Sequence, residues 1–118
     1  MSDFDLSTLP IVAARAASTK TDRPIVVLDV GEVLAITGHF VIASGGTARQ
    51  VRAIAEAIEE VVAESGGPKP VRIEGLAEGS WVLMDYGDVI VHVMDDETRE
   101  FYDLERLWRD VPVVDWES

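Results

Sequence analysis

Residues 81–94 read WVLMDYGDVIVHVM and predict a β-hairpin whose strands are joined by a tight turn at Gly87-Asp88. Gly-Asp suits a two-residue hairpin loop, because glycine readily takes the positive φ of the first turn position. This loop sets the register and predicts an almost wholly apolar face made of Val82, Met84, Tyr86, Val89, Val91 and Val93. The opposite face then carries Trp81 beside Met94, Leu83 beside His92, and Asp85 beside Ile90. A sheet with one apolar and one mixed face needs cover on both sides.

The flanking sequence predicts further helices and strands in an α+β order. The expected elements are a helix over 6–18, a strand over 25–30, a loop over 31–38, a strand over 40–43, a helix from Thr47 to Gly66, a strand over 71–73, and a helical turn plus a short helix over 95–108 with Leu104, Leu107 and Trp108 turned inward. This order predicts an α+β fold with a mixed β-sheet and helices mainly on one face.

The chain has 118 residues, which is the size of one domain, and 47% of them are hydrophobic, which is enough for a folded core. We expect a single domain over 1–118, with its core at 6–109 and a C-terminal tail at 110–118. The chain has no cysteine, which excludes disulfides, zinc–thiolate sites and cysteine nucleophiles. Acidic Asp3 and Asp5 near the start argue against a signal peptide, so we expect a cytoplasmic protein.

The formal net charge is −12. A charge of this sign argues against direct binding to nucleic acid and favours a basic partner, although plain solubility explains an acidic surface equally well.

Two patterns are compatible with an enzyme. Ser44-Gly45-Gly46-Thr47 lies where a strand gives way to a helix, and a phosphate can bind the backbone N–H groups there. The lysine of a P-loop is absent, and a turn with a helix cap formed by Thr47 and Gln50 explains the same residues. Five acids are candidates for a magnesium site, but turn and strand-edge roles are favoured: Asp29, Asp85, Asp88, Asp95 and Asp96. We therefore expect no metal and no cofactor.

The mixed face of the hairpin holds the candidate binding residues. Trp81 is either core beneath a helix or an anchor at an interface, where tryptophan is enriched. Asp85 is placed to pair with a basic group of a partner. His92 is a weak catalytic candidate, because no nucleophile pattern accompanies it and the other histidine, His39, is on a loop.

Several motifs in order resemble the ribosomal silencing factor (RsfS, or Iojap) family. They are LDV at 28–30, FVIASG at 40–45, RQVRAIA at 49–55, EG at 74–75, WVLMDYGDVIVHV at 81–93 and REFYDLERLW at 99–108. The resemblance covers roughly residues 6–109. In this chain Thr37-Gly38 stands where the family usually has Thr-Asp.

The resemblance implies a nucleotidyltransferase-like fold without established transferase activity. It implies a non-enzymatic translational repressor that binds the large ribosomal subunit through its ribosomal protein fourteen and blocks joining of the small subunit when nutrients are short. The implied contact residues are Trp81, Leu83 and Asp85, with His92 and Met94 beside them, and the free protein is expected to form a homodimer. The alternative is a nucleotidyltransferase or another nucleotide-binding enzyme.

Overall fold

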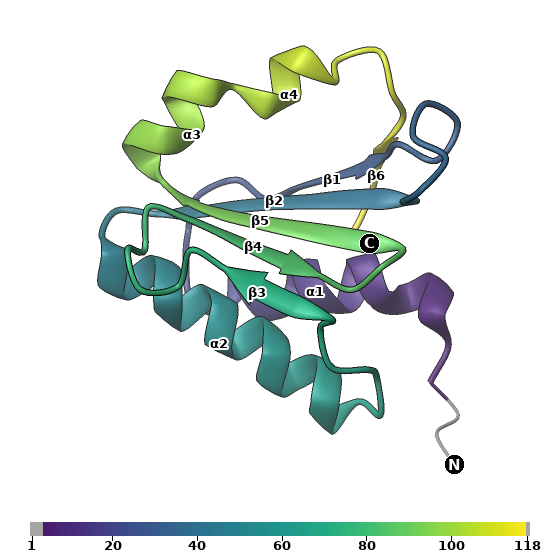
Figure 1. Cartoon of the computed structure of the whole chain (residues 1–118), viewed down its shortest axis with the longest axis horizontal. Helices are drawn as coiled ribbons and strands as arrows, with labels where there is room; N and C mark the ends of the chain where they lie inside the picture. Colours follow the sequence, from purple (N-terminus) through teal and green to yellow (C-terminus); the bar gives the residue numbers. More distant parts are fainter. Residues whose placement is uncertain (1–3, 118) are drawn as a thin grey trace.

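The computed structural model describes residues 4–117 and contains a six-stranded mixed sheet with helices on both faces (Figure 1). The expected domain limits at residues 1 and 118, and Asp3, lie outside the described residues. The elements are η1 (Leu6–Thr8), α1 (Leu9–Ser18), β1 (Val26–Asp29), β2 (His39–Gly45), α2 (Ala48–Glu64), β3 (Arg72–Glu74), β4 (Trp81–Asp85), β5 (Val89–Asp95), α3 (Asp96–Tyr102), α4 (Leu104–Leu107) and β6 (Val113–Val114). None of the helices within 4–117 has the length and apolar character needed to cross a membrane.

The strands lie in the order β3-β4-β5-β2-β1-β6. β2 and β5 run parallel over seven residues, from His39 beside Val89 to Gly45 beside Asp95, and the other neighbouring strands run antiparallel. The expectation of an α+β fold with a mixed sheet is therefore confirmed.

The predicted hairpin register is confirmed pair by pair, with Trp81 beside Met94, Leu83 beside His92 and Asp85 beside Ile90. At the turn, the Tyr86 N–H donates to the Val89 carbonyl at 2.9 Å, and Gly87 has a φ of 88°. The local turn chemistry thus fixed which side chains share a face.

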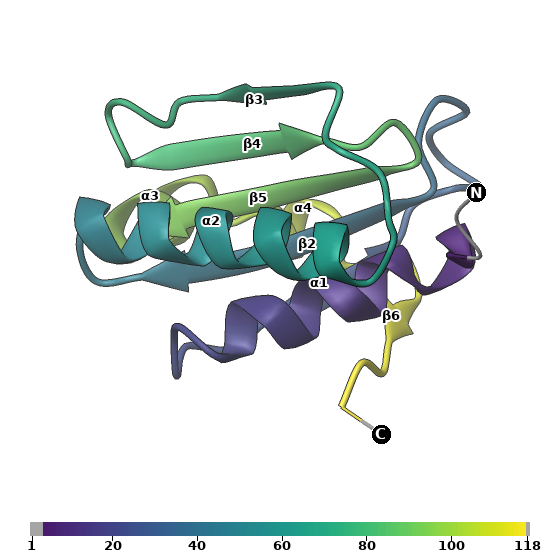
Figure 2. The ribbon, with the colours of Figure 1, turned by 90° about the horizontal axis from the view of Figure 1, so that it is seen from below.

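The two longer helices, α1 and α2, cover the apolar face of the sheet side by side (Figure 2). α2 presents one buried stripe to the sheet, formed by Val51, Ile54, Ala55, Ile58 and Val62. α1 buries four alanines, whose small side chains let the two helices approach closely. This layer and the apolar hairpin face form the larger hydrophobic core.

The two longer helices lie on the apolar face, in keeping with helices mainly on one face, and the opposite face is covered by the short helices α3 and α4 (Figure 1). A smaller core lies beneath them, formed by Leu28, Val30, Phe40, Ile42 and Met94. Leu104 and Trp108 pack against this core as predicted. Leu107 does not, because 73% of its side chain is exposed.

The C-terminal segment, expected as a tail at 110–118, makes contacts with the sheet and the core in the structure. β6 adds to the outer edge of β1, with Val114 beside Val27 and Val113 beside Leu28. Beyond it, the Trp116 indole N–H donates to the Ile25 carbonyl at 2.8 Å, and its ring packs against the larger core. These contacts span more than 80 positions of sequence, so local patterns do not reveal them.

Candidate partner-binding surface

The predicted site residues all lie on the mixed face of the hairpin, but at different depths. Trp81, Leu83 and Asp85 are partly exposed on β4. His92 is 7% exposed and Met94 is 0% exposed on β5. Met94 therefore belongs to the core beneath the surface and has no exposed atoms with which to touch a partner. The surface itself is formed by the β4 side chains and the edge of His92.

His92 is held in place by two aromatic neighbours. The Trp81 indole N–H donates to its Nδ1 at 3.1 Å, and the Phe40 ring meets it edge-on at a centroid distance of 4.9 Å. Burial lowers the pKa of His92 to about 4, so the ring is neutral at physiological pH. With Nδ1 accepting from Trp81, the ring proton of this neutral tautomer is on Nε2. These features hold His92 in one orientation and one tautomer, with Nε2 buried beneath the surface.

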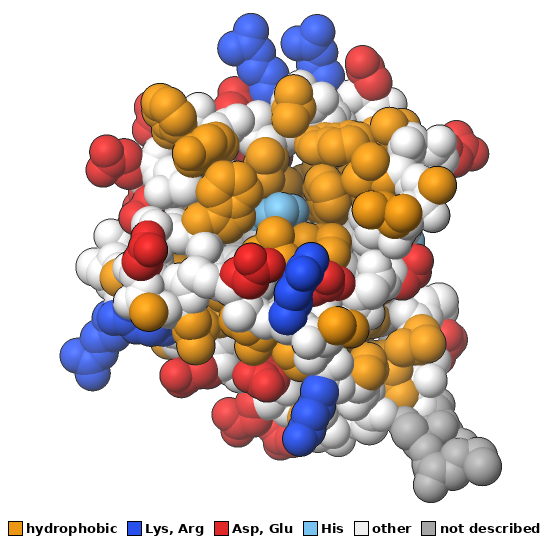
Figure 3. Space-filling view, in the orientation of Figure 1, with side chains coloured by type: hydrophobic (Ala, Val, Ile, Leu, Met, Phe, Trp, Pro, Cys, Tyr) orange, Lys and Arg blue, Asp and Glu red, His pale blue; other side chains and the backbone are white. Residues whose placement is uncertain are grey.

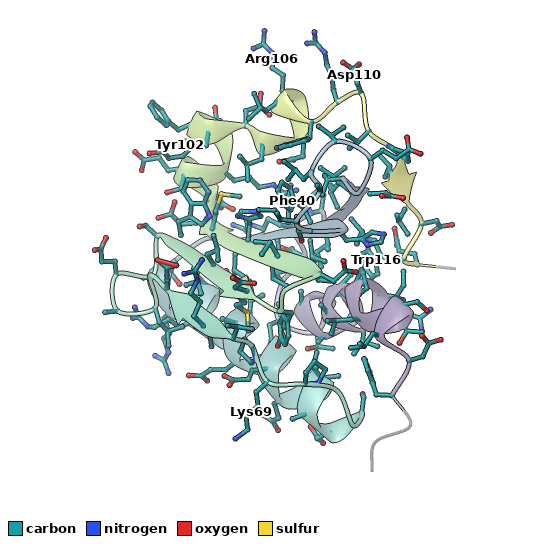
Figure 4. The ribbon with its side chains drawn as sticks, turned by 45° about the vertical axis from the view of Figure 1, so that its right-hand side comes forward. Phe40, Lys69, Tyr102, Arg106, Asp110 and Trp116 are labelled. Atoms are coloured by element: carbon teal, nitrogen blue, oxygen red, sulfur yellow. The ribbon has the colours of Figure 1, made fainter. Side chains whose placement is uncertain are left out.

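α3 adds exposed aromatic rings that are not among the residues predicted from the sequence. Tyr102 packs on Trp81 at a centroid distance of 4.7 Å and is 52% exposed, and the neighbouring Phe101 is 78% exposed. Figure 4 shows Tyr102 on α3 and Phe40 in the sheet layer below it, while Arg106 points away from the sheet. The sequence did contain one signal for an exposed ring on this helix, namely two consecutive aromatic residues in a short polar segment. At least one ring of such a pair must be largely exposed.

Arg99 fastens α3 to the sheet. Its Nη1 donates to the Pro24 carbonyl at 2.6 Å and to Ser44 Oγ at 2.9 Å, and its Nη2 lies 3.1 Å from Glu105 Oε2. Its side chain is only 11% exposed. Because α3 has no fully buried residue, this arginine is a main determinant of where Tyr102 lies.

Asp85 lies at the rim of the surface and is already engaged. Its Oδ1 accepts from the Gly87 N–H at 2.8 Å, and its Oδ2 lies 3.4 Å from Arg72 Nε. Figure 3 shows apolar side chains gathered around a hollow, with acidic and basic side chains along one side. The surface thus has an apolar centre and a charged rim, the usual pattern of a protein interface.

The acids considered for magnesium are used in turns, caps and ion pairs. Asp29 accepts from the Gly31 N–H, Asp95 caps α3 through the Thr98 N–H, and Asp96 pairs with Arg23 at 2.8 Å. This arginine lowers the pKa of Asp96. Within residues 4–117, no three His, Cys, Asp or Glu side chains are grouped so that they would hold a metal ion.

The start of α2 is capped by the chain itself. The Gln50 N–H donates to Thr47 Oγ1 at 3.1 Å, and the Gly46 N–H donates to Gln50 Oε1 at 2.7 Å. The hydroxyl of Ser44 accepts from Arg99. The residues considered for phosphate binding therefore already have partners, which favours the turn-and-cap interpretation.

Gly38, where the resemblance leads us to expect an acid, is enclosed by Asp88. A Cβ built on Gly38 would lie 3.0 Å from both carboxylate oxygens of Asp88, and the Gly38 N–H donates to the Asp88 carbonyl at 2.8 Å. A second acid at position 38 would crowd and repel this carboxylate, so the glycine suits its surroundings.

Comparison with known proteins identifies the family. A family model described as "Ribosomal silencing factor during starvation" matches residues 5–118. This chain belongs to the ribosomal silencing factor family. The match includes the C-terminal residues that the motif-based resemblance left out, in agreement with the place of β6 in the sheet.

Relatives in several bacteria support this assignment. The ribosomal silencing factor RsfS of Bacillus subtilis is 38% identical over 104 residues, which are 88% of this chain and 87% of that protein. A crystal structure of a protein from Chromobacterium violaceum has a TM-score of 0.83 at 33% identity and covers 90% of this chain and 88% of that one. The chloroplastic Iojap protein of Zea mays is 30% identical over 90% of this chain and 46% of its own length.

Proposed function

We propose that this protein is a translational repressor that binds the large ribosomal subunit and prevents the small subunit from joining it under nutrient limitation. The docking partner is ribosomal protein fourteen of the large subunit, and the protein acts in the cytoplasm. Membership of the ribosomal silencing factor family supports this proposal. The structural observation that carries it is the exposed aromatic cluster of Trp81, Tyr102 and Phe101 on the mixed face.

This cluster has the properties of a docking site. Single apolar side chains on a surface are ordinary, but adjacent exposed aromatic rings backed by a rigid sheet are typical of interface anchors. Trp81 is held from behind by His92 and from the side by Tyr102. It therefore loses little conformational freedom when a partner covers it, which favours binding.

The charge of the chain suits a basic partner. With a net charge of −12, the protein attracts positively charged proteins over long range and is repelled by exposed RNA phosphates. Docking on a basic ribosomal protein is consistent with both effects.

Blockade requires no catalysis. The molecule measures 39 × 30 × 27 Å along its principal axes. A body of this size, held by an interface of about 1,600 Å² in total, fills space that the joining subunit would need. We propose that the fold is nucleotidyltransferase-like, but a nucleotide-binding activity has no support from the capped start of α2.

Co-sedimentation with purified large subunits tests the proposal. Trp81→Ala removes the central ring, and we expect it to weaken binding about 30-fold or more, as loss of an interface anchor of ~2 kcal/mol predicts. Asp85→Lys reverses the charge at the rim and should weaken binding to a basic partner.

Glu60→Lys is the matched control for the charge change. Glu60 is exposed on α2, on the opposite face, and its replacement alters the net charge by the same amount. Undiminished binding of both Trp81→Ala and Asp85→Lys, with normal melting curves, would exclude this surface.

We also propose that the free protein forms a homodimer, because its exposed aromatic cluster would be covered by a second copy. Sedimentation equilibrium over a range of concentrations measures this. A single monomer mass at every concentration would contradict the dimer without affecting the ribosomal proposal.

A further inference from the structure

The connector of residues 19–25, between α1 and β1, bonds to four parts of the molecule that are distant in the sequence. The Lys20 carbonyl accepts from the Gln50 side chain at 3.0 Å, and the Thr21 hydroxyl donates to the Ser44 carbonyl at 2.7 Å. These two bonds attach its first half to the start of α2 and to the end of β2. Its second half holds α3 and the C-terminal segment.

α3 is bound to the connector at two points. The Arg99 guanidinium donates to the Pro24 carbonyl at 2.6 Å, and Arg23 makes two bonds to Asp96, of 2.8 and 3.1 Å. The pair of Arg23 with Asp96 is well exposed and therefore contributes little. The bond to Pro24 is charge-assisted and comes from a side chain that is only 11% exposed, so it is the stronger of the two attachments.

The C-terminal segment is bound to the next carbonyl of the same connector. The Trp116 indole N–H donates to the Ile25 carbonyl at 2.8 Å, and its ring packs against the larger core. Arg99 and Trp116 thus hold adjacent peptide units from opposite faces of the sheet (Figure 1). Only the φ and ψ of Ile25 separate these two planar units, and its buried side chain restricts both angles. A displacement of one carbonyl is therefore transmitted to the other.

We propose that the connector couples the C-terminal segment to α3. By fixing the Ile25 carbonyl, Trp116 holds the Pro24 carbonyl where Arg99 reaches it, so release of the C-terminal segment loosens α3 and the position of Tyr102. α3 depends on such anchors because none of its residues is fully buried. The coupling goes beyond the proposed function, and only its consequence for docking rests on that function.

Trp116→Phe tests the coupling by amide hydrogen exchange. Phenylalanine keeps an aromatic ring against the core and removes the N–H that bonds to the Ile25 carbonyl. We expect the amides of α3 to exchange about threefold faster or more, the effect of a moderate interaction between groups that share a partner. Unchanged exchange in α3 would overturn the proposal.

Val114→Ala is the matched control within the same C-terminal segment. Val114 pairs with Val27 of β1 and packs against the larger core, so its truncation loosens β6 without removing the bond to the connector. Exchange should rise in β6 and stay unchanged in α3. An equal rise in α3 for Val114→Ala and Trp116→Phe would show that loosening passes along the chain from β6 to α4, and the connector would be excluded as the route.

The reverse experiment starts from α3, because coupling between two sites is reciprocal. Arg99→Met removes the bond to Pro24, and we expect the amides of β6 to exchange faster as a result. Arg99 also pairs with Glu105 on α4, which offers a second route to β6. Glu105→Gln removes that ion pair and keeps the bond to Pro24, so it should loosen β6 much less. An equal effect of the two variants would assign the coupling to α4 and overturn the proposal.

These exchange measurements use the free protein, so their outcome is independent of the proposed function. If the coupling is observed but the unaltered protein does not bind large subunits, only the consequence for docking fails. If the unaltered protein binds large subunits and Trp116→Phe leaves exchange in α3 unchanged, the proposed function stands and the coupling is overturned.

Discussion

At the scale of single residues, the pairing of Trp81 with His92 determines the character of the surface. The indole N–H of Trp81 donates to His92 within the protein, so the ring can serve a partner as a purely apolar anchor. The same bond occupies Nδ1 of the imidazole and leaves Nε2–H as its one donor. The hairpin register placed these residues on one face but not in contact, because the predicted neighbour of His92 was Leu83. Their contact is diagonal across the strands, and it depends on side-chain rotamers that the sequence pattern does not specify.

The buried imidazole predicts a pH dependence of stability. The pKa of His92 is about 4 in the folded protein, against an ordinary value of 6.5. As the pH falls, the unfolded chain therefore binds a proton at this residue at a higher pH than the folded protein does. Stability should therefore be complete above pH 6.5 and decline toward pH 4, by up to about 2 kcal/mol between pH 7 and pH 5. Urea unfolding at several pH values measures it.

His92→Phe is the comparison for this effect. Phenylalanine keeps the packing against Phe40 but has no titrating group. The variant is expected to be less stable at pH 7, because the Trp81 N–H loses its acceptor, yet its stability should change less between pH 7 and pH 5. An identical pH dependence in both proteins would show that His92 does not cause it.

At the scale of elements, prediction from the sequence worked where local rules were sufficient. The hairpin was predicted with its register because the Gly87-Asp88 turn sets the strand pairing within fourteen residues. The partners of α3, the aromatic pair on it and strand β6 depend on contacts between distant parts of the chain. The predicted site therefore included the strand residues and omitted Tyr102, which comes from the covering helix.

The attachment of α3 predicts a clear effect of Arg99→Met. Methionine retains much of the apolar stem but loses the bonds to Pro24, Ser44 and Glu105. We expect the free energy of unfolding to fall by about 2 kcal/mol. This is less than the cost of breaking a fully buried ion pair, because Glu105 is 34% exposed. Tryptophan fluorescence should also change, because Tyr102 no longer stays packed on Trp81. Arg106→Met, at a solvent-facing position on α4, should change neither the free energy of unfolding nor the tryptophan fluorescence.

At the scale of the whole molecule, both edges of the sheet are protected. β6 covers the outer edge of β1, and the opposite edge strand, β3, carries the charged residues Arg72 and Glu74. Charged edges and covering segments hinder edge-to-edge association of sheets. The C-terminal residues therefore contribute both to stability and to solubility.

Trp116→Ala tests the contribution of the C-terminal segment. The variant loses the bond to the Ile25 carbonyl and the packing of the ring against the larger core. We expect a loss of about 2 kcal/mol, below the range for a fully buried tryptophan, because this ring is only partly buried. Chemical unfolding measures the change, and light scattering should show more aggregation. Val113→Ala, at a position 71% exposed in the same segment, is the control and should have little effect.

The attachment of α3 through one arginine also sets how fast its backbone amides exchange with solvent. β2 and β5 lie at the centre of the sheet between two cores, whereas α3 has no fully buried residue. Amides in α3 should exchange deuterium through local opening, well before those of β2 and β5, which open only with global unfolding. The proposed docking face thus combines side chains fixed on the sheet with aromatic rings carried by one of the least stable elements. Binding of a partner should therefore slow exchange in α3 far more than in the strands beneath it.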